Sequence, residues 1–379
     1  MRLSLALTGL AAVAVNASCK GRSSGSSTGS STGASSGSAY NTTNPSYNTT
    51  SGAASSVSSA AALSSPTSSS ASGNVKAASA STTSAANSGI KGFNYGAFFL
   101  NQQALTQTDF EAEFNRANNL PGTSGWNSAR LYTMIQWGTA SDVIPAIPAA
   151  IATQTTLLLG LWISGGDAAI ANELTALETA ISTYGTAFTD LVVGISVGSE
   201  DLYRDANGEV GASATYLLDC ISQVRAKIAD TGLANVPVGH VDTYDSFLNS
   251  TNTAVIEAID WIGFDGYPYW ETALPNSIED AHERFYSGYN KTMALANGKP
   301  VYVTETGWPV SGDDQNLAVA SVENARTYWE TIACSLISSG INIWWYTLQE
   351  SQYGDATPDF GVYGAGDLST LTPSYDLSC

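Results

Sequence analysis

Residues 301–309 read Val-Tyr-Val-Thr-Glu-Thr-Gly-Trp-Pro, a pattern that predicts a short strand ending in a carboxylate. β-Branched and aromatic residues favour a strand, and Gly307 and Pro309 prevent it from continuing. Glu305 is therefore expected at a strand exit. In a barrel of parallel strands, that end is the face where loops build active sites. Taken alone, Glu305 also fits a strand-end residue that bonds to a loop, an interpretation that a second such stretch weakens.

A second stretch repeats this pattern about a hundred positions earlier. Residues 191–200 form an apolar run that ends in Glu200, and the run is long enough for a strand buried on both faces. The two glutamates are 105 residues apart. That spacing equals three strand-plus-helix units of about 31 to 35 residues each. We therefore expect Glu200 to end the fourth strand and Glu305 the seventh, so that both carboxylates face one cleft, as glycoside hydrolysis requires.

The chain from residue 89 to 379 alternates strand-like apolar runs with helical patterns. The expected strands are residues 90–99, 128–133, 156–163, 191–197, 236–242, 260–265, 300–304 and 341–348. Among the helices, Thr108 and Glu111 suggest a capping box ahead of Phe110. Eight alternations predict an α/β fold, a (β/α)8 TIM barrel. A doubly wound open sheet is the alternative, but residues 92–96 lack the glycine spacing of a nucleotide-binding loop.

The first 88 residues differ in composition from the rest. Residues 1–18 are typical of a secretory signal peptide, since the apolar stretch is too short to span a bilayer; an acylated Cys19 is a weaker alternative. Residues 19–88 are rich in Ser and Thr and lack the apolar residues of a core, so a disordered stalk is expected. Asn41 and Asn48 begin glycosylation sequons there, as Asn249 and Asn290 do later. We expect secretion, with no lipid-anchor tail at the C-terminus.

Charge and residue counts exclude several classes of function. The formal charge of −19 disfavours nucleic acid and polyanionic substrates. Only His240 and His282 are present, so a His-rich metal site is not expected. We interpret His240 as a hydrogen-bonded barrel residue and His282 as part of a solvated helix face. No metal or cofactor is expected.

The cysteines and the aromatic residues each suggest a role. Cys334 and Cys379 are expected to form a disulfide, which secretion permits, and Cys220 is expected to be a buried free thiol. Tyr267, Trp270 and Trp308 follow predicted strands. We expect flat apolar platforms there, which suit sugar rings.

These motifs carry a resemblance to a known family. Residues 304–309 resemble the nucleophile signature of glycoside hydrolase family 17, and residues 195–200 resemble its acid/base segment. The resemblance covers about residues 89–379, with supporting segments at 130–132, 265–269 and 360–363. Together with the Ser/Thr-rich segment, the chain resembles the fungal secreted or wall-associated endo-β-1,3-glucanases of that family.

The resemblance implies a retaining mechanism and a set of site residues. Glu305 is implied to be the nucleophile and Glu200 the proton donor and base. The implied substrate-binding residues are Tyr95, Arg130, Tyr132, Ser199, Asp265, Tyr267, Trp308 and Glu350. Tyr267 is expected to position the nucleophile and Glu350 to orient groups or bind substrate. Arg130 is either a partner of Glu305 or a structural ion pair.

Two positions depart from the family pattern. Many members have Asn before the acid/base Glu, where its amide holds a sugar hydroxyl, and this chain has Ser199. Val310 replaces a small polar residue after Trp-Pro. Neither change removes a catalytic carboxylate.

Three functions remain open from the sequence. The first is endo-acting hydrolysis of β-1,3-glucan, with a monomeric, wall-associated enzyme and glucan as its partner. The second is a β-1,3-glucanosyltransferase that uses the same two glutamates. The third is a catalytically silent wall protein that binds glucan, which the presence of both glutamates disfavours.

Overall fold

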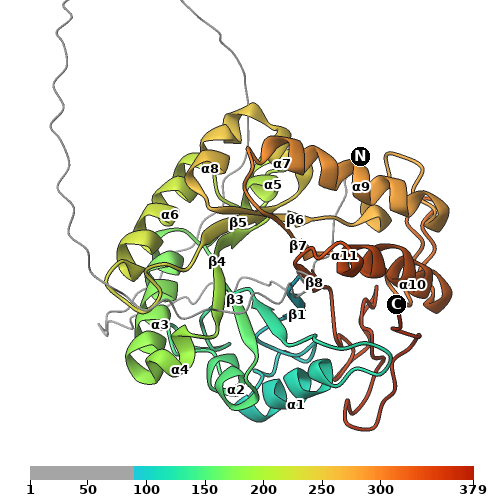
Figure 1. Ribbon diagram of the computed structural model, residues 1–379, viewed down its shortest axis with the longest axis horizontal. Helices are drawn as coiled ribbons and strands as arrows, with labels where there is room; N and C mark the ends of the chain where they lie inside the picture. The colour runs from blue at the N-terminus through green and yellow to red at the C-terminus, as the bar shows by residue number, and fades with distance from the viewer. Residues whose placement is uncertain (1–88) are drawn as a thin grey trace, which may run out of the picture. The chain divides into compact units, whose positions relative to one another are not determined.

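The structure is a computed structural model that describes residues 89–379 (Figure 1). The predicted signal peptide and Ser/Thr-rich stalk, with Asn41 and Asn48, lie outside the described residues. Within residues 89–379, no helix is both long enough and apolar enough to cross a membrane.

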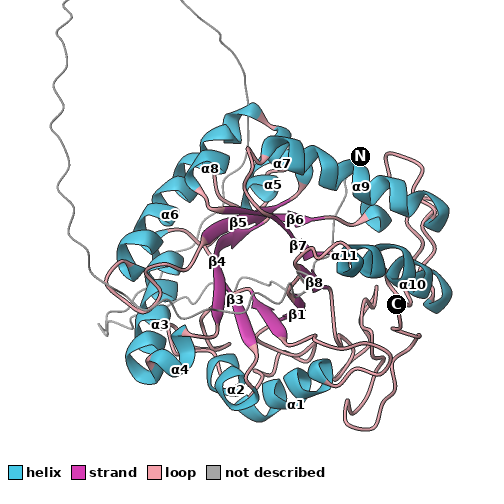
Figure 2. Ribbon diagram, in the orientation of Figure 1, coloured by secondary structure: helices cyan, strands magenta, loops and turns pink. Residues whose placement is uncertain are grey.

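Eight parallel strands close into a barrel in sequential order, which confirms the predicted (β/α)8 fold (Figure 2). The strands are β1 (Lys91–Tyr95), β2 (Ser128–Leu131), β3 (Thr156–Leu161), β4 (Val192–Ser199), β5 (Val238–Asp242), β6 (Trp261–Asp265), β7 (Val301–Glu305) and β8 (Ile343–Trp345). Each lies inside or within two residues of its predicted range. Register places Asn94 of β1 beside Arg130 of β2, so both side chains point to the same side of the sheet.

Helices surround the barrel, as Figure 2 shows. The α-helices are α1 (Gln107–Asn118), α2 (Ala146–Thr153), α3 (Asp167–Tyr184), α4 (Thr186–Thr189), α5 (Asp201–Ala206), α6 (Ala214–Ile228), α7 (Tyr244–Leu248), α8 (Thr253–Ala258), α9 (Ile278–Leu295), α10 (Val322–Tyr328) and α11 (Cys334–Ser338). Short turns of other helix types lie at Ser250–Asn252, Pro268–Trp270 and Trp329–Ala333. Helix α6 shows the general principle, since its buried residues recur at helical spacing and face the strands.

The N-terminus of α1 corrects one sequence prediction. The capping box consists of Thr106 and Asp109, because the Thr106 side chain accepts from the Asp109 backbone and Asp109 bonds back to the Thr106 backbone. The predicted pair, Thr108 and Glu111, lies two residues further along, inside the helix. Both pairs have the required spacing, and the position of Phe110 on the buried face selects the earlier start.

Two apolar regions make up the core. Most buried side chains lie between the strands and the helices. A separate cluster of Leu158, Val241, Trp261 and Trp344 fills the interior of the barrel. The Trp344 indole donates to Ser128 Oγ at 3.1 Å, so the polar atom of this buried ring is satisfied.

The chain after β8 contains no helix in the described residues 346–379, so an irregular segment follows the last strand. Its end is anchored because Cys379 forms a disulfide with Cys334, and the Trp329 indole donates to the Leu377 carbonyl at 3.1 Å. In Figure 1 this segment lies beside α1. Cys220 is a buried free thiol and His282 is exposed, as expected.

Candidate active site

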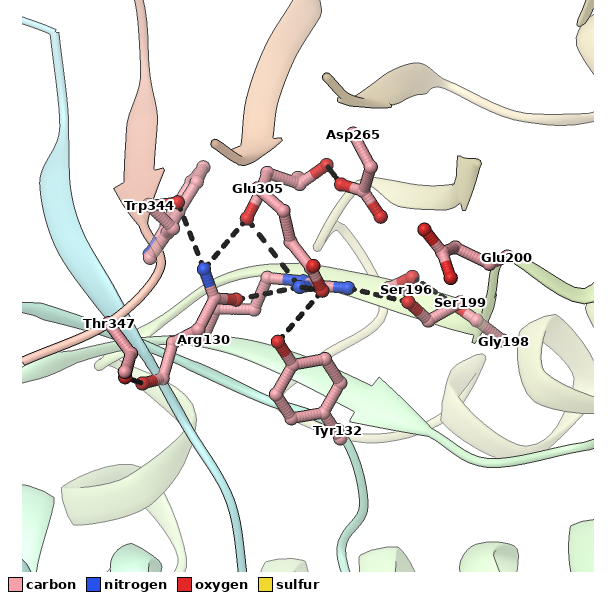
Figure 3. Close-up of polar contacts among 12 residues, drawn as sticks. Arg130, Tyr132, Ser196, Gly198, Ser199, Glu200, Asp265, Glu305, Trp344 and Thr347 are labelled. Atoms are coloured by element: carbon pink, nitrogen blue, oxygen red, sulfur yellow. Dashed lines mark hydrogen bonds and ion pairs between the residues drawn. The ribbon is translucent and has the colours of Figure 1, made fainter. Parts of the chain in front are cut away.

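The two glutamates lie at the C-terminal ends of their strands, as the spacing predicts. Glu305 is the last residue of β7, and Glu200 directly follows β4. Their side chains come from different parts of the barrel rim (Figure 3). Glu305 is 3 % exposed and Glu200 is 8 % exposed. Both carboxyl groups are therefore largely removed from solvent.

Hydrogen-bond donors surround Glu305. Arg130 Nη1 lies 2.6 Å from its Oε1, and the Tyr132 hydroxyl donates to the same oxygen at 2.7 Å. The Tyr267 hydroxyl donates to Oε2 at 2.8 Å. Donors to both oxygens fix the orientation of a carboxylate.

Arg130 is itself held by a buried network. Its Nη1 donates to Asn94 Oδ1 at 2.6 Å, and its Nη2 donates to Ser199 Oγ at 2.9 Å. The Asn94 amide donates to the carbonyls of Thr304 and Trp344 at 3.0 and 2.9 Å. Arg130 is thus both the ion-pair partner of Glu305 and part of the barrel's polar interior. Since Ser199 accepts from Arg130, its own hydroxyl proton remains free for another acceptor.

The backbone at Glu200 is left-handed, with φ 55° and ψ 24°, a conformation that is uncommon outside glycine. Neighbouring bonds hold it in place. The Glu200 amide donates to the Val241 carbonyl at 2.8 Å, the Ser199 amide to Asp201 at 2.8 Å and the Leu202 amide to Asp242 at 2.9 Å. This backbone is constrained on both sides of the carboxylate.

His240 contacts two residues next to this constrained segment. Its Nδ1 lies 2.7 Å from the Val197 carbonyl, and its Nε2 lies 3.1 Å from Asp242 Oδ2. A carbonyl only accepts, so Nδ1 carries a proton. Burial lowers the pKa of His240, but the bond to Asp242 and the charges of Asp242 and Asp201 outweigh it, so the pKa is raised. His240 is thus a buried structural group, as predicted.

Glu200 lies in surroundings that favour a proton. Burial, followed by the negative charge of Glu305, raises the pKa of Glu200 to about 8, although Arg204 at 3.0 Å opposes the shift. Asp265 is shifted the same way, because burial and then Glu305 raise its pKa. Asp265 Oδ1 accepts from Thr304 Oγ1 at 2.7 Å, and within residues 89–379 its Oδ2 has no hydrogen-bond partner.

Two cavities flank this arrangement. One of about 260 Å³ is lined by residues that include Glu200, Asp265, Tyr267 and Trp270. The other, of about 110 Å³, is lined by residues that include Tyr132, Tyr346 and Glu350. Glu305 accepts one hydrogen bond from a tyrosine of each cavity wall, Tyr267 of the first and Tyr132 of the second. Two carboxyl groups, one that accepts three hydrogen bonds and one whose pKa is raised, suit acid-assisted nucleophilic displacement.

Comparisons with known proteins agree with this geometry. Residues 92–362 match the BtgE/BtgC glycoside hydrolase domain. The chain belongs to this family. A probable glucan endo-1,3-β-glucosidase from Aspergillus niger is 55 % identical over 295 residues, which cover 76 % of this chain and 63 % of that protein. The match thus spans less than two thirds of that relative's length.

Solved structures point the same way. A glycoside hydrolase family 17 β-1,3-glucanosyltransferase from Rhizomucor miehei is 26 % identical, with a TM-score of 0.63, over 76 % of this chain and 98 % of that one. An active-site mutant of a Rhizomucor miehei β-1,3-glucanosyltransferase in complex with laminaritriose is 25 % identical, with a TM-score of 0.62, over 76 % and 98 %. The resemblance to glycoside hydrolase family 17 is confirmed.

One predicted substrate-binding residue of this glycoside hydrolase domain, Trp308, lines neither of the two cavities. Trp308 is only 1 % exposed, packs against Tyr269 and Tyr328, and donates its indole proton to the Val319 carbonyl at 3.0 Å. It is therefore a core residue and not a platform. Of the three expected platforms, Tyr267 and Trp270 line the 260 Å³ cavity.

Tyr95 also differs from its predicted role. Strand alternation directs Asn94 into the polar network, so Tyr95 points the other way and packs edge-on against Phe114 of α1. Its ring is 5 % exposed. Tyr95 still lines the 110 Å³ cavity, but Asn94, which the sequence reasoning missed, is the β1 residue that bonds to Arg130. A polar residue inside a buried strand, in register with Arg130, was the available signal.

Glu350 lies beyond β8 and contacts the site indirectly. It accepts from the Tyr346 hydroxyl at 3.1 Å and from the Phe360 amide at 3.0 Å. Burial raises its pKa to about 7. The Tyr346 ring packs edge-on against Tyr267, so Glu350 supports the tyrosines around Glu305.

The remaining predicted positions lie on the domain surface. Asn249 and Asn290 are exposed. No group of three or more metal-ligating side chains gathers in the part of the chain that the structure describes.

Proposed function

We propose that this chain hydrolyses internal β-1,3-glucosidic bonds of β-glucan with retention of configuration. The observation that carries the proposal is the contrast between Glu305, which receives Arg130, Tyr132 and Tyr267, and Glu200, whose pKa is about 8. The printed name of the Aspergillus niger relative supports the substrate. So does the laminaritriose bound to the Rhizomucor miehei structure.

In the proposed first step, Glu305 attacks the anomeric carbon while Glu200 protonates the departing glycosidic oxygen. The bond to the leaving sugar breaks as the ester bond to Glu305 forms. The charge on Glu305 is then lost, and with it one of the causes that raise the pKa of Glu200. With a lower pKa, Glu200 stays deprotonated after it has given up its proton, so it can accept a proton from the water that hydrolyses the ester.

The remaining side chains are assigned by their contacts. The nucleophile is positioned by Arg130, Tyr132 and Tyr267. Near it, Ser199 has a free hydroxyl proton, and Asp265 has an oxygen without a hydrogen-bond partner within residues 89–379. Glu350 orients Tyr346. We assign substrate contact to Trp270 of the 260 Å³ cavity in place of Trp308.

For the whole chain we propose a secreted, wall-associated monomer. Residues 1–18 serve as the signal peptide, residues 19–88 as a glycosylated stalk and residues 89–379 as the catalytic domain. Names of fungal glucanases among the relatives support an extracellular site of action. Asn41, Asn48, Asn249 and Asn290 are the proposed glycosylation positions, and the exposure of the last two supports their modification.

A second candidate, glucanosyl transfer, is favoured by the similarity to the Rhizomucor miehei glucanosyltransferase. It shares the first step, after which a sugar hydroxyl replaces water. The two outcomes differ only in which acceptor reaches the ester on Glu305.

Product analysis tests both candidates. The full chain is incubated with a β-1,3-linked gluco-oligosaccharide of defined length, beside Glu305→Gln and a matched surface control, Glu330→Gln. Shorter products of unchanged anomeric configuration support the retaining hydrolase, and longer products support transfer. No conversion of any β-1,3-glucan by a folded sample would favour the silent binding protein and overturn the proposal.

A further inference from the structure

A cavity of about 700 Å³ lies between α1 and the irregular C-terminal segment. Neither Glu200 nor Glu305 lines it. On α1 its wall runs from Thr108 in the first turn to the cap residue Asn119. At 1.5 Å per residue, this is about 16 Å, the length of the helix. The groove therefore extends along the side of the barrel, whereas the glutamates lie at the strand ends. We call it the α1 groove.

Glu113 is the unusual residue of this groove. Its side chain is on the buried face of α1, it is 8 % exposed, and within residues 89–379 its Oε2 has no hydrogen-bond partner. The two other carboxylates in the wall are occupied, since Asp109 accepts from the Thr106 amide and Asp367 accepts from the Ser369 amide. An unpaired buried carboxyl group is costly, so a ligand that pairs with it gains affinity.

The surroundings of Glu113 indicate what kind of ligand fits. Burial, and then the charge of Asp109, raise the pKa of Glu113 to about 8, so at neutral pH it offers both a proton and an acceptor oxygen. A hydroxyl group has the same dual character. The other polar groups of the wall include amides and hydroxyls of Asn115, Asn119, Gln352 and Ser369. Tyr353, which is 50 % exposed, adds an aromatic face.

The groove is linked to the proposed active site. Glu113 and Gln352 also line the 110 Å³ cavity, which contains Tyr132 and Tyr346. Tyr95 lines that cavity too, and its buried hydroxyl is a second unpartnered polar atom there within the described residues. A polyhydroxylated chain that enters the smaller cavity thus has further polar groups ahead of it on α1.

We propose that the α1 groove is a second carbohydrate-binding site, which holds a neutral gluco-oligosaccharide segment outside the catalytic cleft. This inference rests on the proposed function for the identity of the sugar. Glu113 hydrogen-bonds to a sugar hydroxyl, and Tyr353 stacks on a ring. The site would retain the enzyme on a long or insoluble glucan while the cleft cuts it.

Calorimetry with a β-1,3-linked glucose hexamer tests the proposal. The full chain carries Glu200→Gln and Glu305→Gln, so the probe stays intact. We expect two binding events. Ala112→Trp fills the groove and removes one of them, whereas the matched control Asn118→Trp, on the same helix but outside the groove, keeps both. A single event that Ala112→Trp leaves unchanged overturns the second site alone, and no binding at all overturns the proposed function as well.

Glu113→Leu separates binding from a structural role. Replacing an unpaired buried carboxyl group with an apolar side chain of similar size is near neutral for stability. We expect the thermal midpoint to hold and the affinity of the second event to fall about tenfold, the loss of one hydrogen bond of about 1.4 kcal/mol. Unchanged affinity of that event, with or without a lower thermal midpoint, contradicts the proposal.

Discussion

Glu305 and Glu200 are identical side chains at the same edge of one barrel, yet their surroundings differ. Glu305 receives hydrogen bonds from Arg130, Tyr132 and Tyr267, which fix the orientation of its carboxylate. For Glu200, burial and the charge of Glu305 raise the pKa, and Arg204 opposes this shift. In the proposed mechanism, the carboxylate that accepts these hydrogen bonds is the nucleophile, and the carboxyl group whose pKa is raised by burial is the acid.

The largest expected effect is from Glu305→Gln, which removes the proposed nucleophile. The rate of glucan cleavage should fall at least about a thousandfold, because no second carboxylate occupies the same set of donors. Initial rates on a soluble β-1,3-glucan measure this. Activity within tenfold of the unmodified chain would contradict the assignment.

Glu200→Gln should have a smaller effect that depends on the leaving group. General acid catalysis contributes about 10²–10⁴-fold, so glucan cleavage should fall by that amount. An aryl glycoside with a good leaving group should lose much less activity, since it needs little protonation. Glu209→Gln, which removes the other carboxylate partner of Arg204, is the matched control. Equal losses on both substrates would argue against Glu200 as the acid.

Tyr267→Phe and Tyr132→Phe test the donors around Glu305 individually. A hydrogen bond to a charged group contributes about 1.5–3 kcal/mol, so each change should lower kcat/KM by roughly 10- to 150-fold. Tyr346→Phe is the control, because its hydroxyl donates to Glu350. Equal losses of kcat/KM in all three variants would show that the hydrogen bonds to Glu305 contribute no more than the bond from Tyr346 to Glu350.

His240→Gln tests the support beneath Glu200. Losing the contacts to Val197 and Asp242 should loosen the left-handed backbone that carries the acid. We expect kcat to fall about tenfold with little change in KM, since substrate contacts are untouched. A drop in thermal midpoint with unchanged kcat would show that His240 serves stability alone.

The sequence was sufficient for the fold because strand and helix patterns were regular. All eight strands were predicted, and the spacing of Glu200 and Glu305 placed them at the correct strand ends. Boundaries were less certain, as at residues 341–348, where only Ile343–Trp345 pairs as a strand. Backbone pairing ends before the apolar pattern does, which hydrophobicity alone does not reveal.

The direction of side chains was the harder problem. Trp308 lies at its predicted position in the chain but packs in the core. Tyr95 packs against Phe114 and lines only the smaller cavity, whereas Asn94 bonds directly to Arg130. Motif position does not determine on which side of a turn a ring packs. The sequence also did not reveal the buried group of His240, Asp242 and Asp201, because these residues come together only when β4 and β5 pair.

The pKa of Glu200 is the most direct test of the comparison. A ¹³C NMR titration of its carboxyl group is carried out on the full chain and on Glu305→Gln. A buried acid with a raised pKa stays protonated at neutral pH, so activity should fall as the pH rises through about 8. The account predicts a pKa of about 8 that drops when Glu305 is neutral. A pKa near the ordinary value of 4.5 in both proteins would contradict it.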